Sequence, residues 1–271
     1  MLCTIEFLNN PQKTFYAGNT LYGLLHIFLK QAKFIDVLII HIKGRAKVGF
    51  KDDRSLEFRS AKRKLIDENL LVLSNIQLPP GHHSFHFDFA LPWSCPQSLK
   101  SKSGFIKYEA VVVIPRTFRD KRIPFKFTIL SYFPLPFIEE IDPIKVNIST
   151  QNTVSFPKYD FILGEPIFID IDIDELGLNK KDRKIIFCLV QYIWYHSNER
   201  CGSVNKKKEK TNILRIPIVT SESIYNSCFR IPPTIPTTME YLDIIKIRYA
   251  LKIYVDKEKF KCPIVIGDYY Q

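Results

Sequence analysis

Alanine is scarce in this sequence of 271 residues, with 7 positions against 36 isoleucines, 21 phenylalanines and 13 tyrosines. Alanine is the best helix former, whereas β-branched and aromatic residues suit the pleated, half-buried surface of a sheet. The periodic segments between the 17 prolines and 10 glycines are mostly short, and no βαβ rhythm joins them. The composition therefore predicts a nearly all-β chain, and the main competing helix lies within residues 57–71.

Long apolar runs and targeting signals are also missing. No window approaches the about 18 apolar residues of a membrane-spanning helix. The start, MLCTIEFLNN, has neither a basic region nor a continuous apolar stretch, which argues against a secretory signal. Six cysteines without a CxxC pair fit a reducing compartment. We expect a cytoplasmic protein, peripheral at the plasma membrane or endosomes if it meets a membrane at all.

Motifs for catalysis are absent as well. The sequence has no GxSxG, HExxH or GxGxxG pattern and no P-loop, so neither an enzyme nor a cofactor is expected, and no residue is assigned as catalytic. His82, His86 and Asp88 share one face of a strand but offer a single plausible chelating pair, so no metal site is expected. No RNP1-like signature or groove-reading helix points to nucleic acid.

A boundary is visible near the middle of the chain. The run FPLPFIEEIDP (133–143) holds three prolines and three acids between two strand-like segments, which is typical of a linker. We predict one domain at 1–138, a linker at 139–143 and a second domain at 144–271. The first half carries 20 Lys and Arg against 10 Asp and Glu, the second 19 against 18. This asymmetry favours an anionic partner for the first domain.

The basic residues form a stripe in the segment 37–50. Even positions are apolar, whereas His41, Lys43, Arg45 and Lys47 point the other way. A stripe of this length spans roughly 20 Å, enough to follow a phosphorylated tail or several lipid headgroups. Lys43, Arg45 and Lys47 are therefore candidates for binding a partner or an anionic surface, and a solvated strand face is the alternative.

A second basic run, Lys206, Lys207 and Lys208, follows the polar segment 198–205. We interpret it as the tip of a hairpin loop. Electrostatic contact with a membrane or an acidic partner is a second candidate site.

Strict alternation, as in HHSFHFDFA (82–90), indicates half-buried strands, so the default architecture is two antiparallel β-sandwiches. Strand alternation predicts two hydrophobic cores. The first contains Phe85, Phe87, Phe89, Val111 and Val113, and the second Ile186, Cys188, Val190, Tyr249 and Leu251.

Several segments, taken in order, resemble one family. The first half contains FYAGNTLYGLLHIFL (15–29), VLIIHIKGRAKVGF (37–50), LPPGHHSFHFDFALPWSCPQSLKSKSGFIKYEAVVVIPR (78–116) and FKFTIL (125–130). The second half contains GEPIFIDIDI (164–173), IIFCLVQYIWY (185–195), IPPTIPTTMEYLDIIKIRYALKIYV (231–255) and CPIVIG (262–267). The series resembles the N- and C-domains of arrestins, of the α-arrestin or arrestin-domain-containing type. The resemblance implies two immunoglobulin-like β-sandwiches.

The resemblance also implies a function. Family members are non-enzymatic adaptors that bind cytoplasmic segments of membrane proteins and direct their endocytosis, endosomal sorting or ubiquitination. α-Arrestins usually recruit ubiquitin ligases through PPxY motifs. This sequence has none, and its nearest approach is FPKY at 156–159, so a ligase partner is doubtful. The alternative is a structural subunit of a sorting coat, resembling the arrestin-like component of retromer.

Overall fold

The computed structural model describes residues 1–8, 10–52, 56–116, 118–131, 133–135, 144–147, 152–173, 183–198, 204–220, 224–256 and 258–269. Across these ranges the regular structure is β-strand, and none of it is a helix able to cross a membrane. The all-β prediction is confirmed, and residues 57–71 belong to a strand rather than a helix for most of their length.

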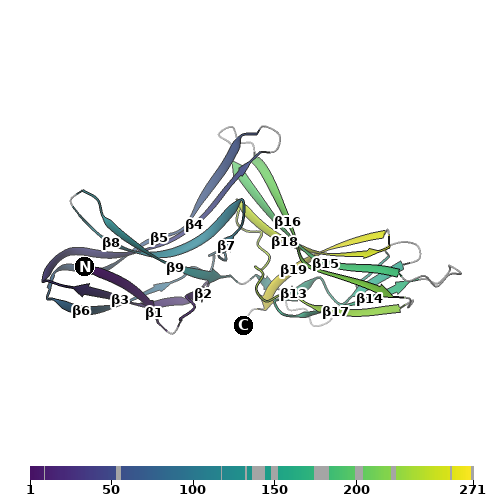
Figure 1. Ribbon diagram of the computed structural model, residues 1–271, viewed down its shortest axis with the longest axis horizontal. Coiled ribbons are helices and arrows are strands. Elements are labelled where there is room, and N and C mark those ends of the chain that lie inside the picture. Colours follow the sequence, from purple (N-terminus) through teal and green to yellow (C-terminus); the bar gives the residue numbers. More distant parts are fainter. Residues whose placement is uncertain are drawn as a thin grey trace. The chain divides into compact units, whose positions relative to one another are not determined.

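The chain divides into two compact units (Figure 1). Unit 1 is Met1–Ser131 with His196–Asn205, and unit 2 is Tyr132–Tyr195 with Lys206–Gln271. The predicted linker at 139–143 lies outside the described residues, so the division into 1–138 and 144–271 stays a prediction.

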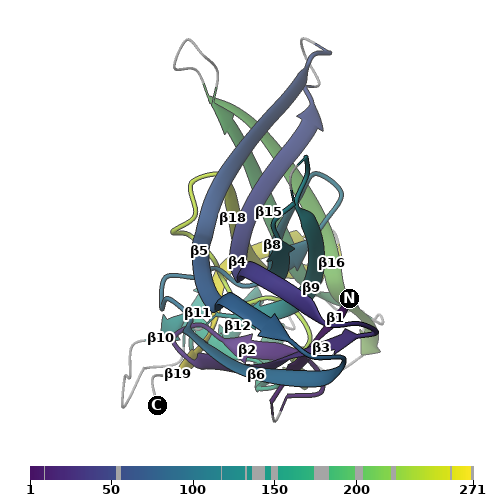
Figure 2. The same cartoon turned by 90° about the vertical axis from the view of Figure 1, so that its left-hand side faces the viewer.

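Unit 1 contains two packed sheets (Figure 2). One has the order β1-β3-β6, and the other β2-β9-β8-β4-β5 with β7 on β8. Phe7 of β1 contacts Phe15 and Phe127 edge-on, so aromatic rings join the sheets. The strands are β1 Leu2–Phe7, β2 Thr14–Tyr16, β3 Thr20–Leu29, β4 Lys33–Lys51, β5 Phe58–Leu78, β6 Gly81–Ala90, β7 Leu99–Lys100, β8 Gly104–Ile114 and β9 Lys121–Leu130.

Alternation predicted the faces of β4 correctly. Its even apolar positions are all buried: Leu38, Ile40, Ile42, Ala46, Val48 and Phe50. On β6, Phe87 is buried and Phe85 and Phe89 are half-buried on the same face. The prediction for β8 was wrong in phase, because Val111 pairs with His41 and Val113 with Ile39. These valines are buried on the face of the basic stripe, and Tyr108, Ala110 and Val112 face the other sheet.

Unit 2 repeats this plan. One sheet has the order β11-β12-β14-β17 and the other β10-β19-β18-β15-β16, with β13 on β19. Phe187 of β15 lies 6.3 Å from Phe229 of β17 between ring centroids, which joins the two sheets. The strands are β10 Pro134–Leu135, β11 Ile144–Asn147, β12 Asn152–Phe156, β13 Asp160–Ile162, β14 Pro166–Ile173, β15 Arg183–Asn198, β16 Val204–Thr220, β17 Ile224–Arg230, β18 Ile245–Val255 and β19 Glu258–Tyr269.

The second predicted core mixes two faces of β15. Tyr249 and Leu251 do lie on the inter-sheet face, opposite Gln191 and Leu189. Cys188 and Val190 are buried on the opposite face, where they form a separate cluster. The partly buried Ile186, Trp194 and Tyr254 pack against that cluster. This second apolar surface of β15 carries the site described below.

A buried tyrosine anchors the loop before the central strand in each unit. The Tyr108 hydroxyl donates to the Pro96 carbonyl at 2.5 Å, and the Tyr249 hydroxyl donates to the Pro236 carbonyl at 2.5 Å. Burial raises the pKa of the Tyr249 phenol, so the group stays a neutral donor. The two units therefore share this hydrogen bond from a tyrosine to a proline carbonyl, as well as a similar topology.

Candidate functional site

The stripe on β4 lies beside carboxylates on both neighbouring strands. Register places Lys43 opposite Asp67 of β5 and Glu109 of β8. Arg45 Nη2 lies 3.5 Å from Glu109 Oε1, and His41 Nε2 lies 2.7 Å from Asp67 Oδ1. Two of the four residues of the stripe are thus paired.

The pairing of Asp67 extends to a second cation. Lys64 Nζ donates to Asp67 Oδ2 at 2.5 Å. Hydrogen bonds from Lys64 and then His41 hold the pKa of Asp67 below its usual value. The carboxylate therefore stays ionised and partly neutralises this part of the stripe.

Lys43 and Lys47 are half-buried and have no carboxylate of the described chain within ion-pair distance. They are the predicted stripe residues with charge to offer a ligand. Arg45 is exposed, but its ion pair with Glu109 partly neutralises its charge.

The run Lys206, Lys207 and Lys208 is part of strand β16 rather than a loop tip. Alternation puts Lys206, which is exposed, on the same face as Lys208 and puts Lys207 on the other. Lys208 lies over the rings of Tyr192 and Trp194 on one face of the sheet. On the other face, the Tyr195 hydroxyl donates to Glu209 at 2.9 Å, and Lys207 shares that side.

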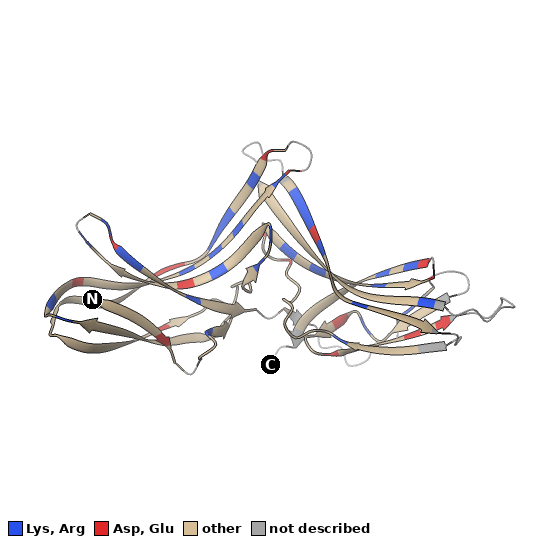
Figure 3. Ribbon diagram, viewed as in Figure 1, with Lys and Arg blue, Asp and Glu red and all other residues tan. Residues whose placement is uncertain are grey.

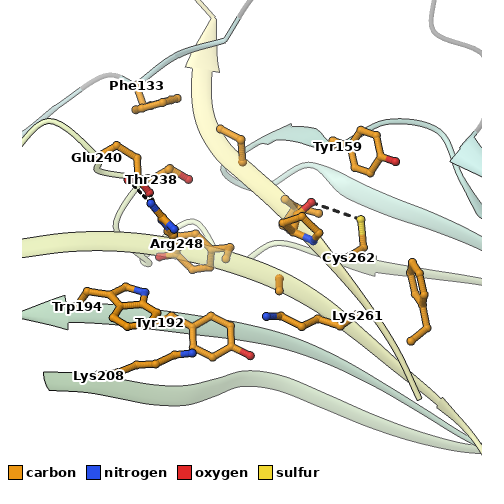
Figure 4. A pocket seen from close by; sticks show the side chains of 16 residues that line it. Phe133, Tyr159, Tyr192, Trp194, Lys208, Thr238, Glu240, Arg248, Lys261 and Cys262 are labelled. Atoms are coloured by element: carbon orange, nitrogen blue, oxygen red, sulfur yellow. Dashed lines mark hydrogen bonds and ion pairs between the residues drawn. The ribbon is translucent and has the colours of Figure 1, made fainter. Parts of the chain in front are cut away.

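Lys208 lines an open groove of about 760 Å³ within unit 2. Its floor is the face of β15 that carries Tyr192 and Trp194 (Figure 4). Aromatic rings make up much of the wall, and basic residues reach in from several strands. The lining comprises Phe133, Tyr159, Tyr192, Trp194, Lys208, Thr238, Glu240, Arg248, Tyr249, Ala250, Phe260, Lys261, Cys262, Pro263, Ile264 and Val265.

Three lysines from three strands converge on the Tyr192 ring. Lys208 Nζ lies 4.2 Å from the Tyr192 centroid and 4.5 Å from that of Trp194. Lys261 and Lys252 lie 5.2 Å and 5.5 Å from the Tyr192 centroid. Cation–π contacts of this kind hold ammonium groups in place without neutralising their charge.

The pKa of the Tyr192 phenol reflects these charges. Burial alone would raise it, but a hydrogen bond from Lys252 and the charges of Lys252, Lys261 and Lys208 outweigh burial and lower it. The hydrogen bond to Tyr192 raises the pKa of Lys252 in turn. Lys252 is only 6% exposed, so most of its side chain is packed, and the hydrogen bond to Tyr192 favours the charged ammonium.

No described carboxylate lies within ion-pair distance of Lys208, Lys252 or Lys261. The one acidic residue of the groove wall, Glu240, is engaged elsewhere. Arg248 binds both of its oxygens, with Nη2 donating to Oε2 at 2.8 Å and Nε donating to Oε1. The groove thus offers an uncompensated positive charge beside aromatic rings, and an anion is its natural ligand.

Sequence reasoning found Lys208 and missed the rest of this cluster. The pair Tyr192 and Trp194 is visible as two aromatics with the i, i+2 spacing of one strand face. Lys252 and Lys261 reach the same place because they are directly opposite each other on β18 and β19. That register is a long-range property that one sequence does not display.

Other residues that could bind a metal or act as nucleophiles lie on β6 and among the cysteines. His82, His86 and Asp88 are exposed on the outer face of β6. The described part of the chain contains no group of three His, Cys, Asp or Glu side chains that fits a metal ion. Burial raises the pKa of the Cys95 and Cys262 thiols to about 11, which leaves them protonated and unreactive at neutral pH.

The two β-sandwiches match the two domains of one protein family. The family model for the arrestin (or S-antigen) N-terminal domain matches residues 3–133, and that for the C-terminal domain matches residues 149–269. A crystal structure of squid arrestin superposes with a TM-score of 0.56 at 13% identity, covering 99% of this chain and 95% of that one. That likeness shows the two-domain arrestin fold.

The chain belongs to the arrestin family, and the curated proteins it is similar to are arrestin domain-containing proteins, of the α-arrestin type. Arrestin domain-containing protein 17 of Caenorhabditis elegans is 23% identical, over 96% of this chain and 68% of that protein. Arrestin domain-containing protein 15 of Caenorhabditis elegans is 25% identical over 78% and 64%. Arrestin domain-containing protein 1 of Rattus norvegicus is 27% identical over 69% and 46%. The chain thus spans about half to two thirds of the length of these relatives.

Proposed function

We propose that this protein is a non-enzymatic adaptor that binds cytoplasmic segments of membrane proteins and directs their endocytosis, endosomal sorting or ubiquitination. Its membership of the arrestin family supports an adaptor role. Such a protein works in the cytoplasm, at the surface of the plasma membrane or of endosomes. The anionic inner leaflet is then its second partner.

The observation that carries the proposal is the charged groove of unit 2. Lys208, Lys252 and Lys261 surround Tyr192 without a described carboxylate partner. A phosphate or carboxylate of a cargo segment placed among them gains charge-assisted hydrogen bonds, which are stronger than neutral ones. Tyr192 and Trp194 offer apolar and aromatic surface to the neighbouring residues of the same segment.

The β4 stripe is a second, weaker contact for the same class of ligand. Lys43 and Lys47 carry its unpaired charge. Arg45 contributes the part of its charge that the ion pair with Glu109 does not neutralise. Figure 3 shows Lys and Arg along β4 and β5 as well as on β16. Exposed charges of this kind add modestly to affinity and are screened by salt.

A peptide titration tests the proposal. Labelled peptides from cytoplasmic segments of membrane proteins, acidic or phosphorylated, are titrated with the purified protein and followed by fluorescence anisotropy. We expect Lys208→Glu to weaken binding about tenfold or more, because a charge-assisted hydrogen bond becomes a repulsion. Lys145→Glu is the matched control, since Lys145 is an exposed lysine on β11 of the same unit.

The control also separates local from general electrostatics. Equal losses in both variants would mean that net charge alone attracts the peptide, and the groove would then have no role. Unchanged affinity in Lys208→Glu would overturn the groove as a cargo site. A protein that binds no peptide alone but co-purifies in fixed ratio with other subunits would favour the coat-subunit alternative.

A further inference from the structure

One end of unit 1 collects several chain segments that are distant in sequence. Leu2 at the start of β1 pairs with Phe28 at the end of β3, and Lys33 at the start of β4 pairs with Leu78 at the end of β5. Val113 near the end of β8 pairs with Ile39. Residues 115–116 and 118–120, between β8 and β9, and the turns 30–32 and 79–80 therefore lie at the same end of the sandwich, on the left in Figure 1.

Large apolar side chains are exposed at this end. Phe118 in the loop 115–120 has an exposed fraction of 101%, so nothing in unit 1 covers its ring. The end carries further exposed apolar residues on other segments: Leu2, Phe28, Phe34 and Ile76. These side chains come from separate strands and loops.

The same end is strongly basic. Its basic residues are Lys30, Lys33, Arg116, Arg119, Lys121 and Arg122, whereas its acidic ones are Asp36 and Asp120. Arg122 Nη2 pairs with Asp120 at 3.5 Å. The remaining cations have no described carboxylate within ion-pair distance. Figure 3 shows Lys and Arg on the hairpin that β8 and β9 form.

One of these cations, Lys121, reaches the N-terminal strand. Lys121 Nζ donates to the Met1 carbonyl at 3.4 Å, so the start of β9 lies beside the start of β1. Burial raises the pKa of the Cys3 thiol, while the charges of Lys121 and Lys33 both act to lower it. The start of β9 thus adds its positive charge to the end of the sandwich where β1 begins.

Exposed apolar side chains set among unpaired cations match the surface of an anionic lipid bilayer. The headgroup region of a bilayer takes up aromatic and aliphatic tips at several separate points, because lipids move to accommodate them. Anionic lipids attract each nearby Lys or Arg with about 1 kcal/mol. A folded protein partner would instead need a continuous complementary face.

We propose that this end of unit 1 docks on an anionic lipid bilayer and that Phe118 inserts into its headgroup region. The inference rests on the proposed function in requiring work at a membrane, and goes beyond it by assigning membrane contact to a surface separate from the β4 stripe and the unit 2 groove. Cargo segments would then bind elsewhere on a protein held at the bilayer by this end.

Vesicle co-sedimentation tests the apolar part of the surface. The full chain is mixed with phosphatidylcholine vesicles with or without phosphatidylserine. We expect the parent to bind the phosphatidylserine vesicles and Phe118→Ser to bind about tenfold more weakly, because one buried aromatic side chain is lost from the bilayer. Phe168→Ser is the matched control, since Phe168 is an exposed phenylalanine on β14 of unit 2.

Charge variants test the electrostatic part. Arg116→Glu combined with Arg119→Glu should abolish the preference for phosphatidylserine, since each lost charge costs about fivefold in partitioning. Lys43→Glu combined with Lys47→Glu should leave vesicle binding within about threefold of the parent, because the β4 stripe lies outside this surface. A larger loss in the second variant would move the membrane contact to the stripe and overturn the proposal.

A fluorescent variant reports insertion directly. Phe118→Trp should show emission shifted to shorter wavelength when phosphatidylserine vesicles are added, whereas the parent, with Trp93 and Trp194 only, should show no such shift. Emission unchanged in Phe118→Trp overturns insertion. If Phe118→Ser instead dissolves a dimer of the parent and vesicle binding is absent, the surface belongs to a second copy, and the lipid proposal fails. The peptide titration above is unaffected by either result, so the two proposals fail independently.

Discussion

The β4 stripe of unit 1 and the Tyr192 groove of unit 2 are basic for different reasons and to different effect. The first half of the chain has ten more basic than acidic residues and the second has one more. Yet the stripe lies beside Glu109 and Asp67, whereas the three lysines around Tyr192 have no described carboxylate partner. Local pairing, rather than the net charge of a domain, determines where an anion is attracted.

The neighbours of each lysine explain the difference. Strands β5 and β8 place carboxylates opposite the stripe, and these carboxylates pair with His41 and Arg45. Strand β15 places Tyr192 and Trp194 beneath Lys208, and the aromatic faces attract the ammonium while leaving its charge in full. Lys252 is largely buried as well, and a charge removed from water interacts more strongly with a ligand.

Charge reversal at both surfaces is the strongest test of this comparison. Lys208→Glu combined with Lys261→Glu should weaken binding of an acidic cytoplasmic peptide by at least about thirtyfold, or roughly 2 kcal/mol. Lys43→Glu, Arg45→Glu and Lys47→Glu combined should weaken it no more than about fivefold, because exposed pairs contribute about 1 kcal/mol or less. Isothermal titration calorimetry gives both values, and a larger loss from the stripe variant would reverse the ranking.

Tyr192→Phe tests how the groove holds its charge. Removing the hydroxyl takes away the hydrogen-bond acceptor of the Lys252 ammonium, and we expect a loss of about 1 kcal/mol of unfolding free energy. The midpoint of urea unfolding measures it. Tyr254→Phe is the control, because Tyr254 is partly buried on β18 and packs against the same cluster.

The same variant has a spectroscopic signature. The pKa of the Tyr192 phenol is lowered by its lysines, so one tyrosine of the parent should ionise before the others in an alkaline ultraviolet titration. The early step should vanish in Tyr192→Phe and persist in Tyr254→Phe. An identical titration curve in all three proteins would show that the lysines do not act on Tyr192 as described.

The fold was accessible from sequence because alternation is a local property. The even positions of β4 and the aromatic strand β6 were predicted on the correct faces from their spacing alone. The errors occur where a strand is apolar on both faces. Val111 to Val113 and Ile185 to Val190 give no polar residue to set the phase. The prediction therefore placed five residues on the wrong face: Val111, Val113, Ile186, Cys188 and Val190.

The sites were accessible only in part. The lysines of the stripe are adjacent on one strand, and their spacing was sufficient to find them. The ion pairs of His41 and Arg45 depend on Asp67 and Glu109, which the pairing of β4 with β5 and β8 brings alongside. The groove likewise depends on the register of β18 with β19, which places Lys252 opposite Lys261. Register is set by long-range packing, so no single segment carries it.

Glu109→Gln should make the stripe bind an acidic peptide more strongly, and so more like the groove. The substitution removes the carboxylate that Arg45 and Lys107 approach at 3.5 Å and 4.0 Å. We expect binding of the acidic peptide to improve about threefold to fivefold, since one partly exposed ion pair is worth about 1 kcal/mol or less. Anisotropy titrations of the parent and of Glu109→Gln measure the change. Weaker binding in the variant would mean that Glu109 positions Arg45 for the ligand rather than competing with it.

The smallest expected effect concerns ubiquitin-ligase recruitment through the segment 156–159. WW domains bind proline-rich ligands in an extended and accessible form. Here Phe156 is fully buried, its ring contacts Tyr159 at 5.7 Å between centroids, and Lys158 Nζ is paired with Glu165 at 2.7 Å. Titration of isolated WW domains with the purified protein should show no binding in the micromolar range, and Tyr159→Ala should change nothing. Micromolar binding that Tyr159→Ala abolishes would show that this segment opens and would give unit 2 a second ligand site, beside a groove that Tyr159 also lines.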